Sequence, residues 1–149
     1  MPDAKTLARG AHETCICGSV RRAARAITQL YDDTLRPSGL RITQFSILGA
    51  TMAMSPITLT RLANATVTDR TTLTRNLRLL EERGLIRIDA GDDRRERQIS
   101  ITREGAEALK AAYPLWQRAQ AQVSKRMGSE HLKAMQDQLA VATVLSRKS

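Results

Sequence analysis

Cysteine, aromatic residues and long apolar runs are all scarce in this chain of 149 residues. Its two cysteines, Cys15 and Cys17, are too few for the disulfide framework of a small secreted domain. No run approaches the roughly 18 apolar residues of a membrane-spanning helix, and the first residues lack the apolar core of a secretory signal. We therefore expect one cytoplasmic domain without a membrane partner, long enough to bury its own core.

The residue sets of common enzymes are also missing. The sequence has no Ser/His/Asp arrangement, no phosphate-binding glycine loop and no paired carboxylates, and its two histidines, His12 and His131, are far apart. A thiol peroxidase built on Cys17 would lack a general base. We expect neither an enzyme nor a bound cofactor.

Positive charge exceeds negative charge, with 24 Lys and Arg against 15 Asp and Glu and a formal net charge of +9. Arginine supplies 19 of the 24 basic residues, and its guanidinium fork suits phosphates and guanine edges. The composition therefore favours a nucleic-acid partner. The excess is +3 in each of the segments 1–42, 58–103 and 104–149, so net charge alone does not locate the binding surface.

Apolar spacing predicts a mainly helical chain. Val20, Ala24, Ile27 and Tyr31 recur at intervals of four, three and four, which indicates one face of a helix from about 14 to 35. Thr14 is its expected cap, and residues 1–10 are polar and expected to be loose. The N-caps expected for four further helices are Thr43, Thr58, Asp69 and Thr102.

Breaking residues set the other boundaries. The helix after Thr43 ends at Ser55-Pro56, the third covers 59–65, and the fourth runs to about Arg83, before Gly84. Two β-branched runs, 85–88 and 98–101, predict an antiparallel hairpin around a charged loop. The long helix after Thr102 is expected to turn Leu109, Tyr113 and Trp116 inward and to bend at Pro114, and Gly128-Ser129 separates it from a last helix.

The two helices within 58–83 form a helix-turn-helix pattern, and the hairpin that follows makes it a winged one. At about 100° per residue, Leu73, Leu77 and Leu80 share one narrow face of the second helix. The opposite face carries Thr71, Thr74, Arg75 and Arg78. Short hydroxyls between long guanidiniums suit phosphates and base edges, and Arg70 lies in the first turn, where a helix favours phosphate.

The hairpin tip carries Arg94, Arg95 and Arg97 within four residues. Arginines on a hairpin tip are suited to entering a minor groove. We expect Asp92 or Asp93 to orient an arginine or to close the turn.

Four segments resemble the MarR family of bacterial winged helix-turn-helix regulators: 59–63 (LTRLA), 69–77 (DRTTLTRNL), 80–86 (LEERGLI) and 93–105 (DRRERQISITREG). The resemblance extends over nearly the whole chain from about Thr14. It implies a fold that is mainly α with a small β-hairpin wing, in a single domain over 1–149. The winged helix-turn-helix would cover 43–103, between dimerisation helices at 10–40 and 104–149.

The resemblance also implies a homodimer that binds a palindromic operator in double-stranded DNA, most often as a repressor. A small aromatic or lipophilic ligand, or an oxidant such as an organic hydroperoxide, would release the DNA. The alternative is an architectural protein that binds DNA without sequence preference. The expected DNA contacts are Thr68, Arg70, Thr71, Thr74, Arg75, Arg78, Arg94, Arg95 and Arg97.

The Cys15-x-Cys17 pair allows three interpretations. In the redox interpretation, Cys17 lies in the first helical turn near Arg21, where backbone amides favour a thiolate. The hydroperoxide-sensing branch of the family has a cysteine near this position and a tyrosine fourteen residues later, which here is Tyr31. Fourteen helical residues span about 21 Å, so this pair could meet only across a dimer. The second tyrosine of that branch is replaced by Ile42.

Cys15 and Cys17 are two residues apart, and helical residues i and i+2 point about 200° apart. A disulfide between them within one chain is therefore not expected, and a disulfide between subunits is the alternative. In the metal interpretation, His12, Cys15 and Cys17 supply at most three ligands in a spacing that is not a standard zinc pattern, and we expect no metal site. In the third interpretation, the cysteines are buried or half-buried structural residues of a regulator that responds to a small molecule. Tyr31, Phe45 and Trp116 would suit its ligand cleft, although aromatic residues at helical spacing more often belong to a core.

Overall fold

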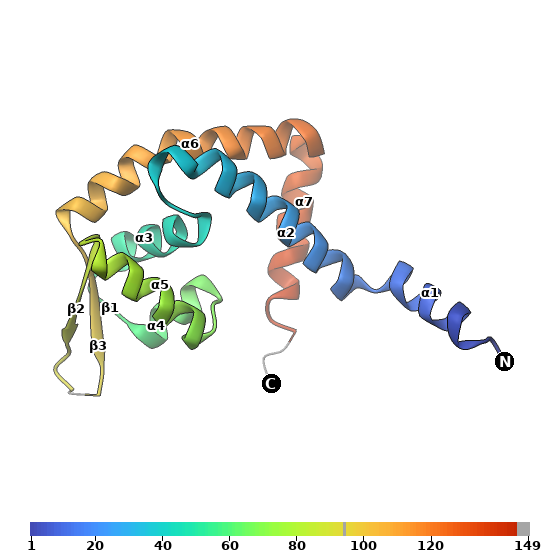
Figure 1. The fold of residues 1–149 in the computed structure, drawn as a ribbon, viewed down its shortest axis with the longest axis horizontal. Coiled ribbons are helices and arrows are strands. Elements are labelled where there is room, and N and C mark those ends of the chain that lie inside the picture. Colours follow the sequence, from blue (N-terminus) through green and yellow to red (C-terminus); the bar gives the residue numbers. More distant parts are fainter. Residues whose placement is uncertain (94, 146–149) are drawn as a thin grey trace.

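The computed structural model describes residues 1–93 and 95–145, and most of these residues are helical (Figure 1). The helices are α1 (Ala4–Thr14), α2 (Ile16–Leu35), the 3-10 turn η1 (Arg36–Ser38), α3 (Ile42–Met54), α4 (Leu59–Thr66), α5 (Arg70–Glu82), α6 (Arg103–Met127) and α7 (Ser129–Ala142). The strands are β1 (Ile57–Thr58), β2 (Ile86–Ala90) and β3 (Arg97–Ile101). The predicted class, mainly α with a small β-wing, is confirmed. Within the described ranges no helix has the length and hydropathy of a membrane span.

The sheet has three antiparallel strands rather than the two of a simple hairpin. The strand order is β1-β3-β2, and Ile99 of β3 lies opposite both Ile57 and Ile88. The predicted pairing of β2 with β3 is confirmed, but β1 was missed because two residues are too few to show an alternating pattern. The extra strand joins the wing to the segment just before α4.

The core of the winged unit lies where α3, α4 and α5 meet the sheet. Its fully buried side chains come from all of these elements: Leu48, Ile57, Leu62, Leu73, Leu80 and Ile99. By the area estimate of roughly 1.5–3 kcal/mol for each buried aliphatic side chain, this cluster is the main source of stability in the unit. It holds α5 in a fixed orientation against the sheet.

Two predicted caps position the helix-turn-helix. Thr58 begins α4, where its Oγ1 accepts a hydrogen bond from the amide of Arg61 at 3.3 Å. Asp69 begins α5, where its Oδ1 accepts from the amide of Thr72 at 2.9 Å. Gly84 follows α5 with φ +70°, a conformation that favours glycine. These short-range signals fix both ends of the helix that carries most of the expected DNA contacts.

The start of α6 is tied to the end of α5 and the start of β2. Thr102 Oγ1 donates to the carbonyl of Gly84 at 2.6 Å and accepts from the amide of Gly105 at 3.0 Å. A Cβ on Gly105 would stand 1.9 Å from the carbonyl oxygen of Leu85. The Thr-x-x-Gly start of this helix is therefore a packing requirement as well as a cap.

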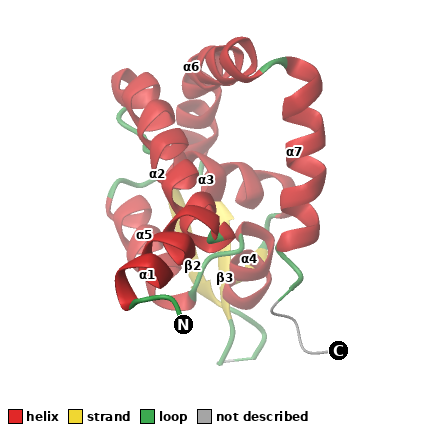
Figure 2. Cartoon of the chain, turned by 90° about the vertical axis from the view of Figure 1, so that its right-hand side faces the viewer, coloured by secondary structure: helices red, strands yellow, loops and turns green. Residues whose placement is uncertain are grey.

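A second layer is formed by α2 and α6, which run side by side in opposite directions (Figures 1 and 2). Tyr31, Ala119 and Val123 are buried between them. Of the predicted apolar face of α2, Val20 and Ala24 are exposed instead, because only the second half of that helix packs on α6.

Tyr113 is also exposed rather than turned inward. Its ring stacks on that of Trp116 with 5.4 Å between the ring centroids, and the ring of Phe45 stacks on Trp116 with 6.0 Å between centroids. Pro114 lies inside a continuous α6, whose two halves run in different directions in Figure 1.

The N-terminal segment is helical, contrary to the expectation that residues 1–10 are loose. Asp3 caps α1 by accepting from the amide of Thr6 at 2.9 Å. None of its residues is buried, and Figure 1 shows α1 extending away from the body of the protein. The apolar pattern did not reveal this helix because it packs on no core.

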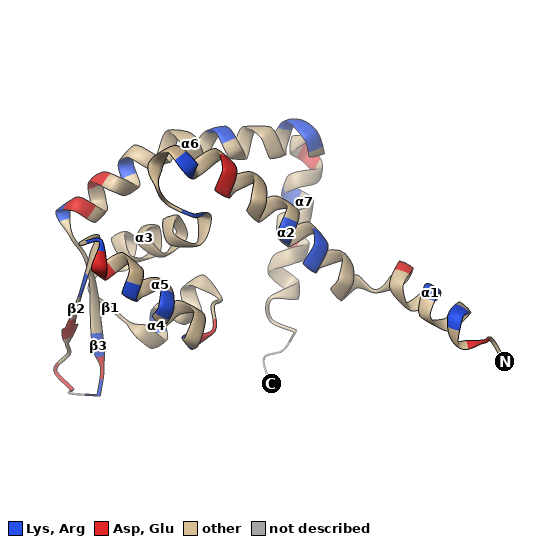
Figure 3. Ribbon diagram, in the orientation of Figure 1, with Lys and Arg blue, Asp and Glu red and all other residues tan. Residues whose placement is uncertain are grey.

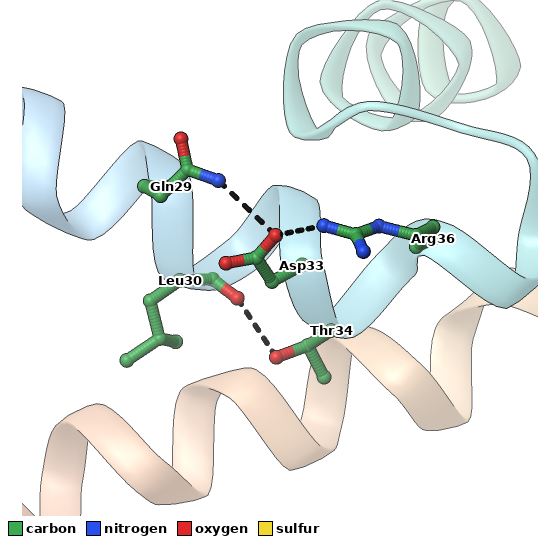
Figure 4. Close-up of polar contacts among 5 residues, drawn as sticks. All are labelled: Gln29, Leu30, Asp33, Thr34 and Arg36. Carbon is green, nitrogen blue, oxygen red and sulfur yellow. Dashed lines mark hydrogen bonds and ion pairs between the residues drawn. The ribbon is translucent and has the colours of Figure 1, made fainter.

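The joint between α2 and α3 is a polar network around η1 (Figure 4). The Asp33 carboxylate accepts from Gln29 at 3.1 Å and pairs with Arg36, whereas Asp32 accepts from the amide of Ile42 at 2.8 Å. Because Asp32 satisfies this amide, α3 begins at Ile42, one residue before the predicted cap Thr43.

A long-range bond reaches the same joint. Nη1 of Arg83, the residue after α5, donates to the carbonyl of Gly39 at 3.0 Å.

Candidate nucleic-acid interface

The two faces of α5 are sorted as the sequence predicts. Leu73, Leu77 and Leu80 are buried against the core. On the opposite face the side chains of Thr71, Thr74, Arg75 and Arg78 are exposed, and Arg70 in the first turn is exposed as well. The predicted placement of these residues on an outward face is therefore confirmed, and the face presents hydroxyls and guanidiniums to solvent.

Local bonds distinguish the members of this face. Thr74 Oγ1 donates to the carbonyl of Arg70 at 2.7 Å, and Arg78 Nε pairs with Glu82 Oε1 at 2.8 Å. Within residues 1–93 and 95–145, neither Arg70 nor Arg75 forms an ion pair. In that part of the chain Arg70 and Arg75 therefore present unpaired guanidiniums to solvent, whereas the charge of Arg78 is partly offset by Glu82.

The turn before α5 is tightly bonded. Thr68 is half-buried, its amide donates to the carbonyl of Ala63 at 3.0 Å, and its hydroxyl donates to the carbonyl of Thr66 at 3.1 Å. Between them Val67 has φ +49° and a 70% exposed side chain. A β-branched residue rarely adopts this left-handed conformation.

Asp93 closes the turn at the tip of the wing, which is one of the roles that the sequence predicts for Asp92 or Asp93. Its Oδ1 accepts from the amide of Arg95 at 3.1 Å, and its carbonyl accepts from the amide of Glu96 at 2.9 Å. Arg95 and Arg97 are exposed, and Arg94 lies outside the described residues. Figure 3 shows basic residues on α5 and on the wing, on the same side of the molecule.

Arginines of the wing and of α5 converge on one cavity of about 180 Å³. Its lining includes Arg70 from the first turn of α5 and Arg95 and Arg97 from the wing. Thr58 and Thr60 at the start of α4 also line it, together with Leu59 and Glu96, and sequence reasoning missed the two threonines as site residues. Their signal was present, since hydroxyl residues at a helix start often contact phosphate. Three guanidiniums and two hydroxyls outweigh the single carboxylate of Glu96, so the surface is suited to a phosphodiester.

The cysteines are exposed, so they are not buried structural residues within the chain. Cys15 separates α1 from α2 in extended backbone, and its Sγ accepts from the amide of Gly18 at 3.5 Å. It, rather than Thr14, is the cap of α2. In the described part of the chain no three His, Cys, Asp or Glu side chains gather as a metal site.

Tyr31 is not brought to Cys17 within the chain. Its hydroxyl donates to Gln120 Oε1 of α6, and burial raises the pKa of Tyr31 above its ordinary value. It also lies in a different buried cluster from Phe45.

Comparison with known proteins agrees with this geometry. The sequence profile of the MarR family matches residues 38–96. A curated relative, the uncharacterized HTH-type transcriptional regulator YwoH of Bacillus subtilis, is 29% identical over 85 residues, which cover 57% of this chain and 62% of that protein. The match thus spans less than two thirds of that relative.

Solved structures match over more of the chain. The M. tuberculosis transcriptional regulator MosR is 40% identical with a TM-score of 0.75, covering 89% of this chain and 99% of that one. MosR in complex with DNA is 42% identical with a TM-score of 0.74, covering 88% and 99%. CouR of Rhodococcus jostii RHA1, bound to p-coumaroyl-CoA, shares the fold at 20% identity with a TM-score of 0.77, covering 92% and 97%. The chain therefore belongs to the MarR family, whose members are DNA-binding transcriptional regulators rather than enzymes.

Proposed function

We propose that this protein is a homodimeric repressor that binds a palindromic operator and is released by a small-molecule ligand or by cysteine oxidation. The observation that carries the proposal is the meeting of Arg70, Arg95 and Arg97 beside the exposed face of α5. This arrangement lets α5 enter a major groove while the wing follows the neighbouring backbone.

Exposed apolar side chains support the dimer. Neither α1 nor α7 contains a buried residue. Large apolar side chains are exposed on these helices, in the residues after α7 and at the start of α2: Leu7, Ile16, Val20, Leu139, Val141, Val144 and Leu145. We assign dimerisation to 10–40 and 104–149 and DNA reading to 43–103. Two-fold symmetry would pair the two α5 helices with half-sites about one DNA turn apart.

The DNA-reading assignment is tested with Arg75→Ala. The wild-type protein is expected to footprint a palindrome selected from random DNA, and the variant is expected to lose the footprint while remaining dimeric. Arg118→Ala on α6 is the control, because that exposed arginine lies outside the winged unit. A normal footprint from Arg75→Ala would contradict the role of that residue.

The second candidate, an architectural protein, shares the charge but needs no sequence preference. Affinities for the selected palindrome and for random DNA, measured at one salt concentration, separate the two functions. We expect a preference of at least about 10³ for a specific regulator. Equal affinities would favour the architectural function.

Release by oxidation has a chemical basis in the exposed cysteines. An organic hydroperoxide can oxidise two thiols to a disulfide, and is itself reduced to the alcohol with release of water. Because Cys15 precedes α2 instead of lying within it, the angular objection to a bond between two helical residues does not apply to it. A bridge within the chain and a bridge between subunits are both open to the exposed thiols.

Oxidation is tested by measuring operator affinity before and after cumene hydroperoxide, for the wild type and for Cys15→Ser/Cys17→Ser. We expect only the wild type to release DNA, and non-reducing electrophoresis to distinguish the two bridges. If the oxidant leaves tight operator binding unchanged, release by oxidation is contradicted and small-molecule ligands should be tested instead. Aromatic acids and their thioesters come first, since CouR of the same fold holds an aromatic acyl-CoA.

A further inference from the structure

A second cavity lies beside α5, and its lining carries no charge. It has a volume of about 150 Å³ and is formed by α3, by the turn before α5 and by one flank of α5. Its walls are mainly apolar, with hydroxyl groups as most of its polar part. The full set of residues is Ile42, Thr43, Ser46, Ile47, Thr66, Thr68, Thr72 and Asn76.

The two cavities occupy opposite flanks of α5. Thr72 and Asn76 face the uncharged cavity, whereas Arg70 faces the cavity of the wing arginines. At about 100° per residue, Arg70 and Thr72 stand about 160° apart around the helix. The exposed face with Thr71 and Arg75 lies between them. Any helix that enters a major groove has one phosphate backbone on each side, so each flank meets a different strand.

Two hydroxyls of this cavity are free to donate. Of the other three, Thr66 and Thr68 already donate to backbone carbonyls at 2.8 and 3.1 Å, and Thr72 bonds the carboxylate of Asp69. Within the described ranges, the side chains of Thr43 and Ser46 make no hydrogen bond and are exposed. They are three residues apart on α3 and so share one face of that helix.

We propose that Thr43 and Ser46 form a second phosphate-binding site, which holds the DNA strand opposite the one held by the wing arginines. The inference rests on the proposed DNA-reading function and adds residues outside the predicted contacts. The two DNA strands would then be bound differently, one by charged arginines and the other by neutral hydroxyls. Guanidiniums release condensed counterions when they neutralise phosphates, whereas neutral hydroxyls contribute hydrogen bonds without releasing ions.

The asymmetry is measured by the salt dependence of affinity. Arg95→Ala is expected to reduce the magnitude of the negative slope of log affinity against log salt concentration by about 0.9 for each subunit, or about two for the dimer. Thr43→Val/Ser46→Ala is expected to weaken binding by about tenfold or more at every salt concentration with an unchanged slope, since a hydrogen bond to a charged group is lost at each position. Ser55→Ala removes an exposed hydroxyl at the other end of α3 that lines neither cavity, so it is the matched control and should have no effect.

The strand assignment is measured on the selected operator with single methylphosphonate substitutions, each of which neutralises one phosphate. We expect a position on one strand where substitution weakens the wild type but not Thr43→Val/Ser46→Ala. At a different position on the other strand, the substitution should weaken the wild type but not Arg95→Ala. The exchange Thr43→Ser/Ser46→Thr keeps both hydroxyls and should keep wild-type affinity, which separates a lost contact from a disturbed fold.

Either of two results would overturn this inference: wild-type affinity of the hydroxyl-free variant, or losses that add independently at every phosphate. If the wild type itself shows no preference for any operator, the proposed function fails and this inference fails with it. That outcome is distinct, because it appears before any variant is made.

Discussion

Val67 shows how a single residue can carry a local conflict. Its φ of +49° places a β-branched side chain in the left-handed region, and 70% of that side chain is exposed. The left-handed conformation costs an ordinary residue about 1–2 kcal/mol, and little packing compensates for it here. The turn between α4 and α5 therefore stores strain.

We expect Val67→Gly to stabilise the protein by about 1 kcal/mol, because glycine adopts positive φ freely and its greater unfolded-state entropy offsets only part of the gain. For a chain of this size the melting temperature should rise by about 2–4 °C, measured by circular dichroism. Val67→Ala, which keeps the unfavourable φ, should gain less. A lower melting temperature for the glycine variant would show that the valine side chain contributes to packing.

Asp69 links the stability of α5 to pH. Hydrogen bonds from the side chain and the amide of Thr72 hold the pKa of Asp69 below its ordinary value of 3.8. A carboxyl whose pKa is lower in the folded state stabilises the fold above its unfolded pKa and loses this contribution as pH falls through the folded value. The cap is therefore intact at neutral pH and lost in acid.

Asp69→Asn should keep the cap, since asparagine is an equally good N-cap residue, and should remove its titration. We expect the melting temperature of the variant to fall less steeply than that of the wild type below about pH 4. Parallel curves for the two proteins would show that the carboxylate of Asp69 does not carry the acid sensitivity.

Among the elements, the start of α6 packs directly on the backbone of Leu85, in addition to the bonds made by the Thr102 side chain. Because a Cβ at Gly105 would stand 1.9 Å from the carbonyl oxygen of Leu85, Gly105→Ala forces α6 away from the sheet. We expect a loss of about 3 kcal/mol in the free energy of unfolding, measured by urea denaturation. Gly49→Ala in α3 is the matched control, since a Cβ there meets nothing within 4 Å. It should stabilise its helix by up to about 1 kcal/mol.

Elements whose signals are local could be predicted from the sequence. The caps Thr58, Asp69 and Thr102 act within three residues, and Leu73, Leu77 and Leu80 define the buried face of α5 by periodicity alone. Elements that depend on distant partners could not. Strand β1 exists only because Ile57 pairs with Ile99, and α1 lacks the core contacts on which an apolar pattern depends.

The candidate site divides in the same way. The outward position of Arg75 follows from helix geometry, and the exposed wing position of Arg95 follows from the hairpin. The meeting of Arg95 with Arg70, and the entry of Thr43 and Ser46 into a common cavity with α5, depend on tertiary packing across three or more elements. No spacing within one segment could have shown them.

At the scale of the whole molecule, the layer that flanks the winged unit exposes apolar surface at both ends of the chain. Val141 in α7 and Leu145 beyond it are 59% and 79% exposed. We expect the wild type to sediment as a dimer and Val141→Asp/Leu145→Asp to shift toward monomer, because buried charge opposes association. Operator affinity should fall with the loss of the paired half-site. Gln138→Asp, an exposed polar position on the same helix, is the control, and a stable dimer of the double variant would place the interface elsewhere.

The bond from Arg83 to the carbonyl of Gly39 spans 44 residues and joins the end of α5 to the end of α2 through η1. It converts the path η1–α3–α4–α5 from an open chain of rods into a closed linkage. In a closed linkage, a rotation of η1 either strains this hydrogen bond or moves α5, so the two elements are coupled more tightly than by chain connectivity alone. A change in the direction of α2 would therefore be passed to α5 by this direct bond as well as along the chain through α3 and α4.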